Sequence, residues 1–209
     1  MQTRVNIFIF LFFIVFAGFK LKANETKPSD YEKYVNEIVK DFSDDMTNTY
    51  ALHCYGSGGS MPSDVEKIEV LFISYRKSTV NDARKMEVDA VQRLLHRINT
   101  HEKIRPYLKE YPFNTDRVNV SISFRTKTDD RPLDGSVALV FLAKNKIFYR
   151  AAEMKMSAPI PLTRINKNNE WTKELVPGKL QEELIPLMEE TYEEALKIVS
   201  IPQGNCMKK

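Results

Sequence analysis

Residues 118–124 read Val-Asn-Val-Ser-Ile-Ser-Phe, a strict alternation of apolar and polar side chains. A period of two predicts a β-strand with one buried face and one polar face. Residues 137–142 follow as an entirely apolar stretch, and a turn at Asn145 separates them from a third stretch, residues 146–152. These three stretches predict a three-stranded antiparallel meander.

Two amphipathic helices and one further strand are expected upstream of the meander. A capping-box pattern, Ser29 with Glu32, begins the first helix, which continues at helical spacing to about Tyr50. Residues 68–73 alternate and are expected to form a strand, and Thr79 begins a second apolar stripe of helical period that ends near residue 98.

Downstream of the meander the pattern is less regular. Residues 156–177 hold prolines and asparagines around the lone tryptophan, which favours an ordered surface loop. Residues 178–200 have apolar side chains at helical spacing and predict a C-terminal helix that is kinked at Pro186, because proline has no amide proton. Residues 201–209 would be a tail. The helix would expose an acidic face made of Glu182, Glu183, Glu189, Glu190, Glu193 and Glu194.

The expected fold is therefore α+β. It comprises an antiparallel sheet of about four strands (one strand, a helix, then a three-stranded meander) with helices packed on one face. Residues 24–209 are expected to form a single domain, of which residues 24–29 are a polar linker.

The N-terminal 23 residues have the pattern of a secretory signal peptide. Arg4 precedes an apolar run at residues 7–19, and a short polar segment ends in Ala23. The run is shorter than the roughly 20 residues that cross a bilayer. We expect cleavage after Ala23 and a periplasmic or secreted protein. Cleavage after Ala17, or an uncleaved inner-membrane anchor through residues 7–19, remain open alternatives, and membrane contact is expected only if the segment is retained.

The charge of the chain disfavours nucleic-acid binding. Arg4, Lys20 and Lys22 lie in the leader, and without them the 31 basic residues fall to 28, equal to the 28 acidic residues. The balanced mature chain has no single-sign field that would attract an anionic polymer.

Cys54 and Cys206 are the two cysteines of the chain. In an oxidising compartment an even pair is compatible with one disulfide, which would hold the C-terminal tail. The alternative is two unpaired thiols.

Residues 53–62 hold three of the seven glycines and are expected to form a loop. The candidate binding residues are Gly56, Ser57, Gly58, Gly59 and Ser60, since glycine allows the backbone of a partner to approach closely. Phosphate binding is disfavoured, because no Gly-Lys-Ser/Thr follows and no strand precedes the loop in the Walker arrangement.

The sequence offers one hypothesis of catalysis. Cys54 could act as a nucleophile in a small envelope thiol hydrolase if His96 or His101 met its sulfur in the fold. His53 is a poor base for it, because adjacent side chains on an extended segment point to opposite faces. Metal-ligand spacings are lacking, so neither a metal nor another cofactor is expected.

Three short strings carry a resemblance. Residues 56–62 (GSGGSMP), 101–108 (HEKIRPYL) and 111–113 (YPF) resemble uncharacterised exported proteins of Chlamydia-like bacteria, over roughly residues 30–155. The resemblance implies a Gram-negative envelope or secreted location and brings no known activity, substrate or site.

Export without an assembled catalytic set favours a non-catalytic binding protein of the bacterial envelope, whose partner is an unidentified protein or envelope component. The thiol hydrolase is the alternative.

Overall fold

The computed structural model describes residues 30–200 of the chain. The predicted leader, the linker, Ser29, Cys206 and the tail lie outside the described residues. The elements in chain order are α1 (Asp30–Tyr50), β1 (His53–Ser60), β2 (Lys67–Ser74), α2 (Val80–Thr100), η1 (Arg105–Tyr107), η2 (Thr115–Arg117), β3 (Val118–Phe124), β4 (Leu139–Ala143), β5 (Lys146–Met156), β6 (Ile160–Ile165), β7 (Trp171–Val176), β8 (Leu180–Thr191) and α3 (Tyr192–Ser200).

The α+β class is confirmed, but the sheet is mixed and larger than the antiparallel sheet of about four strands that was expected. Six strands lie in the order β1-β2-β3-β4-β5-β8, and β6 and β7 form a separate two-stranded sheet. The predicted antiparallel meander is present as β3, β4 and β5. β2 and β3 run parallel, because α2 carries the chain back between them.

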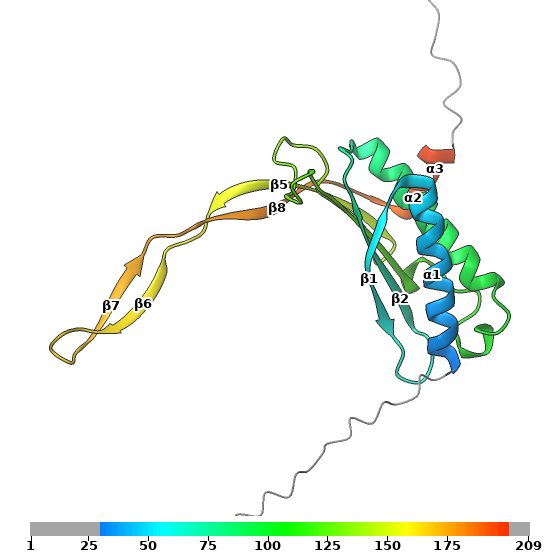
Figure 1. The fold of residues 1–209 in the computed structure, drawn as a ribbon, viewed down its shortest axis with the longest axis horizontal. Coiled ribbons are helices and arrows are strands. Elements are labelled where there is room, and N and C mark those ends of the chain that lie inside the picture. The colour runs from blue at the N-terminus through cyan, green and yellow to red at the C-terminus, as the bar shows by residue number, and fades with distance from the viewer. Residues whose placement is uncertain (1–29, 201–209) are drawn as a thin grey trace, which may run out of the picture.

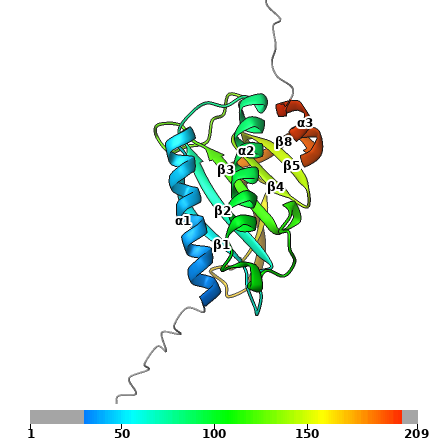
Figure 2. The ribbon, with the colours of Figure 1, turned by 90° about the vertical axis from the view of Figure 1, so that its right-hand side faces the viewer.

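Both long helices form where the sequence predicted them. Thr79 caps α2: its side chain accepts from the Asp82 amide, and the Asp82 carboxylate accepts in return from the Thr79 amide. Apolar stripes of α1 and α2 are buried against the sheet, where Phe42 packs edge-on to Phe72 of β2 with ring centroids 5.6 Å apart. All three helices lie on one face of the six-stranded sheet (Figures 1 and 2).

The predicted surface loop at residues 156–177 is wrong. The chain continues β5 to Met156, forms the hairpin β6–β7, and returns along β8. The turn between β6 and β7 is closed by Asn166, whose side-chain oxygen accepts from the Asn168 and Glu170 amides at 2.9 Å each. The short strands were not predicted because prolines at positions 159, 161 and 177 favour a loop over a strand in the local sequence pattern.

The predicted helix over residues 178–200 is correct only for its last nine residues, α3. Residues 180–191 pair with β5 as an edge strand. Pro186, expected to kink a helix, lies at a register shift opposite the Tyr149/Arg150 step, where an edge strand tolerates the missing amide proton. Thr191 and Glu194 then cap α3 reciprocally: the Thr191 hydroxyl accepts from the Glu194 amide, and the Glu194 carboxylate accepts from the Thr191 amide.

The outer halves of β5 and β8, together with β6 and β7, form an arm that projects from the body (Figure 1). We call residues 153–183 the arm. It leaves the body on the side opposite the helices, so that it is largely hidden behind the sheet in the view of Figure 2.

Candidate functional site

Among the large apolar side chains of the described residues, those with the highest exposed fractions lie on the arm. Trp171 is 72% exposed and Leu175 is 70% exposed, and they share one face of the β6–β7 hairpin. A solvated tryptophan of this kind is unusual in a protein with a well-formed core. The other exposed apolar residues of the arm are Met154, Met156, Ile160, Leu162, Ile165 and Leu180.

The half of the arm nearer the body is amphipathic. Strand register places Met154, Met156 and Leu180 on one face. The opposite face is polar, and Lys155 pairs there with Glu183 at 3.0 Å across the strands. The loop before β4 supports the arm, since Arg131 Nη1 donates to Glu182 Oε1 at 2.7 Å. These contacts hold the arm in an extended position and leave its apolar side chains free to meet a partner.

Sequence reasoning did not single out the arm as a candidate binding surface. The lone tryptophan of the chain was the one signal in this segment, but its exposure follows only from the pairing of β6 and β7 into a hairpin far from the core.

The predicted glycine loop is an edge strand. Gly56, Ser57, Gly58, Gly59 and Ser60 belong to β1, which pairs with β2 and has no strand on its other side within the described residues. Glycine is required at position 59, because a Cβ atom there would lie 2.1 Å from the Lys67 carbonyl oxygen. A Cβ at Gly58 would meet nothing within 4 Å.

The edge of β1 has little protection. None of its eight residues is charged or proline, which are two of the means by which edge strands avoid pairing with other chains. A bulge between Cys54 and Gly56 is the one irregularity along it. This strand can therefore accept an extended segment of a partner through main-chain hydrogen bonds.

Cys54 lies on this strand as an exposed free cysteine, and its Sγ donates to the Gly56 carbonyl oxygen at 3.6 Å. The disulfide expected as one alternative is therefore not formed in the structure, and Cys206 lies outside the described residues. His53 contacts Tyr75, with ring centroids 5.9 Å apart.

The residues of the predicted hydrolase are not brought together. His101 lines a groove of about 280 Å³ between α1 and α2, and His96 lines a neighbouring cavity of about 410 Å³. Cys54 lines neither of them. The His101 imidazole is engaged locally, since its Nδ1 accepts from the Ile104 amide at 3.2 Å.

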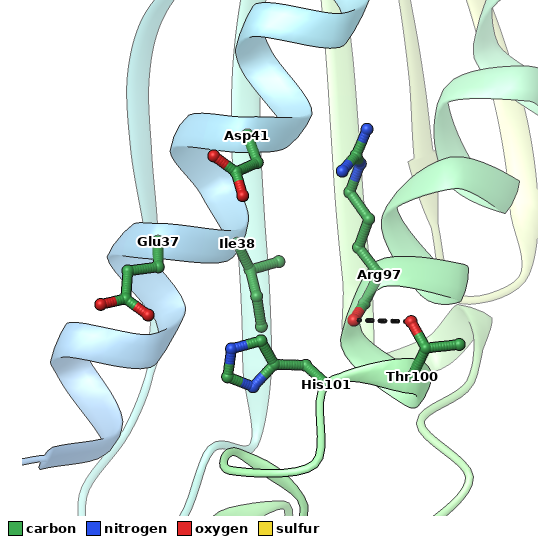
Figure 3. Close-up of a pocket in the computed structure, with 6 residues that line it drawn as sticks. All are labelled: Glu37, Ile38, Asp41, Arg97, Thr100 and His101. Carbon is green, nitrogen blue, oxygen red and sulfur yellow. Dashed lines mark hydrogen bonds between the residues drawn. The ribbon is translucent and has the colours of Figure 1, made fainter.

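Figure 3 shows the first of these grooves, in which Glu37, Ile38 and Asp41 lie on α1. Across the groove are Arg97 and Thr100 of α2 and His101, which follows its last turn. Its strongest cation is already neutralised, because Arg97 Nη2 donates to Asp45 Oδ2 at 2.8 Å. Arg93 donates to the same carboxylate at 3.1 Å. Hydrogen bonding from Arg97 is the main cause that lowers the pKa of Asp45. These ion pairs hold α1 against α2. The groove is therefore best explained as part of the packing interface between the two helices.

A buried polar cluster lies between α2, β5 and β8. Glu190 Oε1 accepts from Arg84 Nε at 2.7 Å and from the Tyr149 hydroxyl at 2.5 Å. Glu190 was expected on a solvated helix face and is instead buried, because residues 180–191 form a strand. Lys146 and Glu189, the neighbour of Glu190, pair at the surface at 3.2 Å.

Glu87 lies close to this cluster and is fully buried. Both of its carboxyl oxygens are without a hydrogen-bond partner among the described residues. Burial raises the pKa of Glu87 well above its usual value, and the Leu142 backbone opposes this only in part, so the charged form of the carboxyl is disfavoured. The cluster has the features of a structural centre that fixes β8 and α3 to α2.

Residues 30–200 contain neither a candidate metal site nor a membrane-spanning helix. Histidine, cysteine and carboxylate side chains form no group of three that could hold a metal ion there. Within the same residues, every helix is too short or too polar to cross a bilayer.

The arm and the β1 edge are thus the two surfaces suited to binding. Comparison with protein family models, with curated protein sequences and with solved structures found no match to this chain.

Proposed function

We propose that this protein is an exported, non-catalytic binding protein that holds a protein partner through its arm. One observation carries the proposal: Trp171 and Leu175 are more than two-thirds exposed along β7 of the projecting hairpin. Tryptophan, methionine and other large side chains are the residues that supply binding energy in protein interfaces.

The chemistry of the arm favours a protein over a charged polymer. Its 31 residues hold five basic and five acidic side chains, so it has no net charge. An anionic lipid surface or a nucleic acid would be attracted by an excess of lysine and arginine. A neutral apolar surface with scattered charges is typical of protein–protein contact.

The β1 edge is the second contact that we assign to this function. Gly56, Ser57, Gly58, Gly59 and Ser60 would let the backbone of the partner approach the sheet closely. Export of the protein to the periplasm or the medium rests on the leader pattern of residues 1–23 and is part of the proposal. An intact mass of the exported protein that corresponds to a chain beginning at Asn24 would support this cleavage.

The test compares affinity-tagged protein with variants in cells that export it. Trp171→Asp with Leu175→Asp removes the apolar anchors of the arm. Asn168→Asp with Asn169→Asp adds the same two charges in the turn of the same hairpin and leaves the anchors in place. We expect the tagged wild type and the tagged control to retain a partner, which is either a different protein or an untagged copy of this chain. We expect the Trp171→Asp, Leu175→Asp variant to retain none.

Equal retention by all three proteins would contradict the role of the arm. Gly58→Val and Ser57→Ala test β1 separately, and unchanged retention with both would exclude that strand from the contact.

A further inference from the structure

A second surface with apolar side chains lies on the body of the protein, on either side of the polar residues Asn119, Ser121 and Ser123 of β3. Strand register places alternate side chains of β2, β4 and β5 on the sheet face that carries no helix. They are half-buried, in contrast to the fully buried side chains of the opposite face. Phe141 and Phe148 stack there with ring centroids 5.0 Å apart. We call the residues Leu71, Ile73, Leu139, Phe141 and Phe148 the helix-free face.

The arm projects from the body on the same side as the helix-free face (Figures 1 and 2). β6 and β7 pair only with each other and do not join the six-stranded sheet. One chain therefore has both an apolar projection and an apolar face.

We propose that the partner of the arm is a second copy of this chain, and that each arm lies across the helix-free face of the other copy. This inference rests on the proposed function and specifies its partner. Because each copy supplies both surfaces, the exchange is reciprocal and closes with two-fold symmetry as a dimer.

The exposed apolar side chains of the arm lie on both of its faces. Strand register places Ile165, Trp171 and Leu175 on one face of the hairpin, and Ile160 and Leu162 on the other. At roughly 100 Å² each, the three on the Trp171 face offer on the order of 300 Å², the size of an apolar binding patch. Because the exchange is reciprocal, each copy buries this face together with its own helix-free face, which gives a contact at the low end of specific interfaces.

The reach of the arm fits the same arrangement. The 16 residue steps from Ala152 to Asn168 span at most roughly 50 Å at the rise of a β-strand. Six strands at their usual spacing form a sheet only about 25 Å wide between its outer strands. The arm can therefore cross a whole sheet of a second copy.

Charge also favours self-association. Five basic and five acidic residues are mixed along the arm. On the helix-free side of the sheet, Lys67 pairs with Glu69 at 2.7 Å and Lys146 with Glu189 at 3.2 Å. Arg150 adds one cation to this side, 5.6 Å from the Phe148 ring centroid. A single cation does not repel the neutral arm of a second copy, whereas a partner of strong single-sign charge would gain little from either surface.

The first experiment measures the mass of the purified protein in solution by analytical ultracentrifugation between 1 and roughly 100 μM, in the range where interfaces of this size are populated. We expect a dimer for the wild type and for Asn168→Asp with Asn169→Asp. We expect a monomer for Trp171→Asp with Leu175→Asp, with an unchanged circular dichroism spectrum. A wild-type monomer over the whole range overturns the inference.

The second experiment locates the contact. A photo-reactive benzoylphenylalanine at position 171 is cross-linked in a mixture of ¹⁵N-labelled and unlabelled copies. Links between a labelled and an unlabelled chain should fall on β2, β4 and β5, the strands that carry the helix-free face. Cross-links found only on the helices or only within the arm of the same copy would overturn the inference. The absence of any cross-link between copies would also overturn it.

The outcomes separate this inference from the proposed function. If the purified protein is a monomer, and the arm retains a different protein in the cell or binds neutral phosphatidylcholine vesicles, the second copy is excluded as the partner. Retention of a different protein would leave the proposed function intact, whereas vesicle binding without any protein partner would overturn both.

Discussion

Arg84 on α2 and Glu190 on β8 form a buried ion pair, with Nε 2.7 Å from Oε1, although 106 positions separate them in the sequence. Their side chains are 7% and 6% exposed, and Tyr149 completes the set by donating its hydroxyl proton to Glu190. The pair joins the body to the base of the strand that returns from the arm.

Breaking this pair should be costly. Glu190→Gln leaves the Arg84 guanidinium buried without a counter-charge, and we expect a loss of about 3–5 kcal/mol in the free energy of unfolding, measured by urea denaturation. Arg84→Met should cost a similar amount. The double variant should lose less than the sum of the two, because neither partner is then left unpaired; strict additivity would show that the two groups do not interact.

Glu87 should make stability fall with rising pH. Its pKa in the fold is raised well above 4.5 by burial, whereas in the unfolded chain the group ionises near its usual value. Its contribution is therefore fully present below the unfolded pKa and is lost as the pH rises toward the folded pKa. We expect Glu87→Gln to be more stable than the wild type at pH 7.5, and the difference to shrink at pH 4.

Thermal unfolding across this pH range measures the effect. The exposed Glu102 provides the control, and Glu102→Gln should follow the wild-type curve. An identical pH dependence of Glu87→Gln and the wild type would show that Glu87 is ionised or solvated in the fold.

Two neighbouring glycines of β1 should respond differently to the same change. Gly59→Ala forces a Cβ atom against the Lys67 carbonyl oxygen, so β1 must shift from β2, at an expected cost of about 1–3 kcal/mol. Gly58→Ala places its methyl group in open space and should change stability by less than about 0.5 kcal/mol. Urea denaturation of both variants measures the two changes in the free energy of unfolding. Equal changes would contradict the described pairing of β1 with β2.

Cys54 should behave as an accessible, non-catalytic thiol. In a Cys206→Ser background we expect an Ellman reagent to titrate one thiol in the native protein, without denaturant, since the side chain is exposed. Cys54→Ser should change the free energy of unfolding by less than about 0.5 kcal/mol. A native protein that yields no thiol would instead indicate that Cys54 is blocked or buried.

Local pattern was enough for the elements that pack against one another in the body. The strict alternation of residues 118–124 and the capped, amphipathic stretch after Thr79 each state which face is buried, so β3 and α2 could be predicted closely. The α+β class follows from the order of those elements. The glycine-rich residues 53–62 were expected to form a loop, whereas residues 53–60 form β1, because glycine gives no apolar period that would indicate a strand.

The arm could not be predicted in the same way. Residues 180–191 have apolar side chains at a spacing that also suits a helix, and only their pairing with β5 makes them a strand and buries Glu190 against Arg84. Sequence by itself determined the two long helices, the meander and the balance of charge, because these depend on neighbouring residues. The tertiary structure alone decided the projecting hairpin, the exposure of Trp171 and the buried ion pair, because strand pairing and burial depend on residues that are distant in the chain.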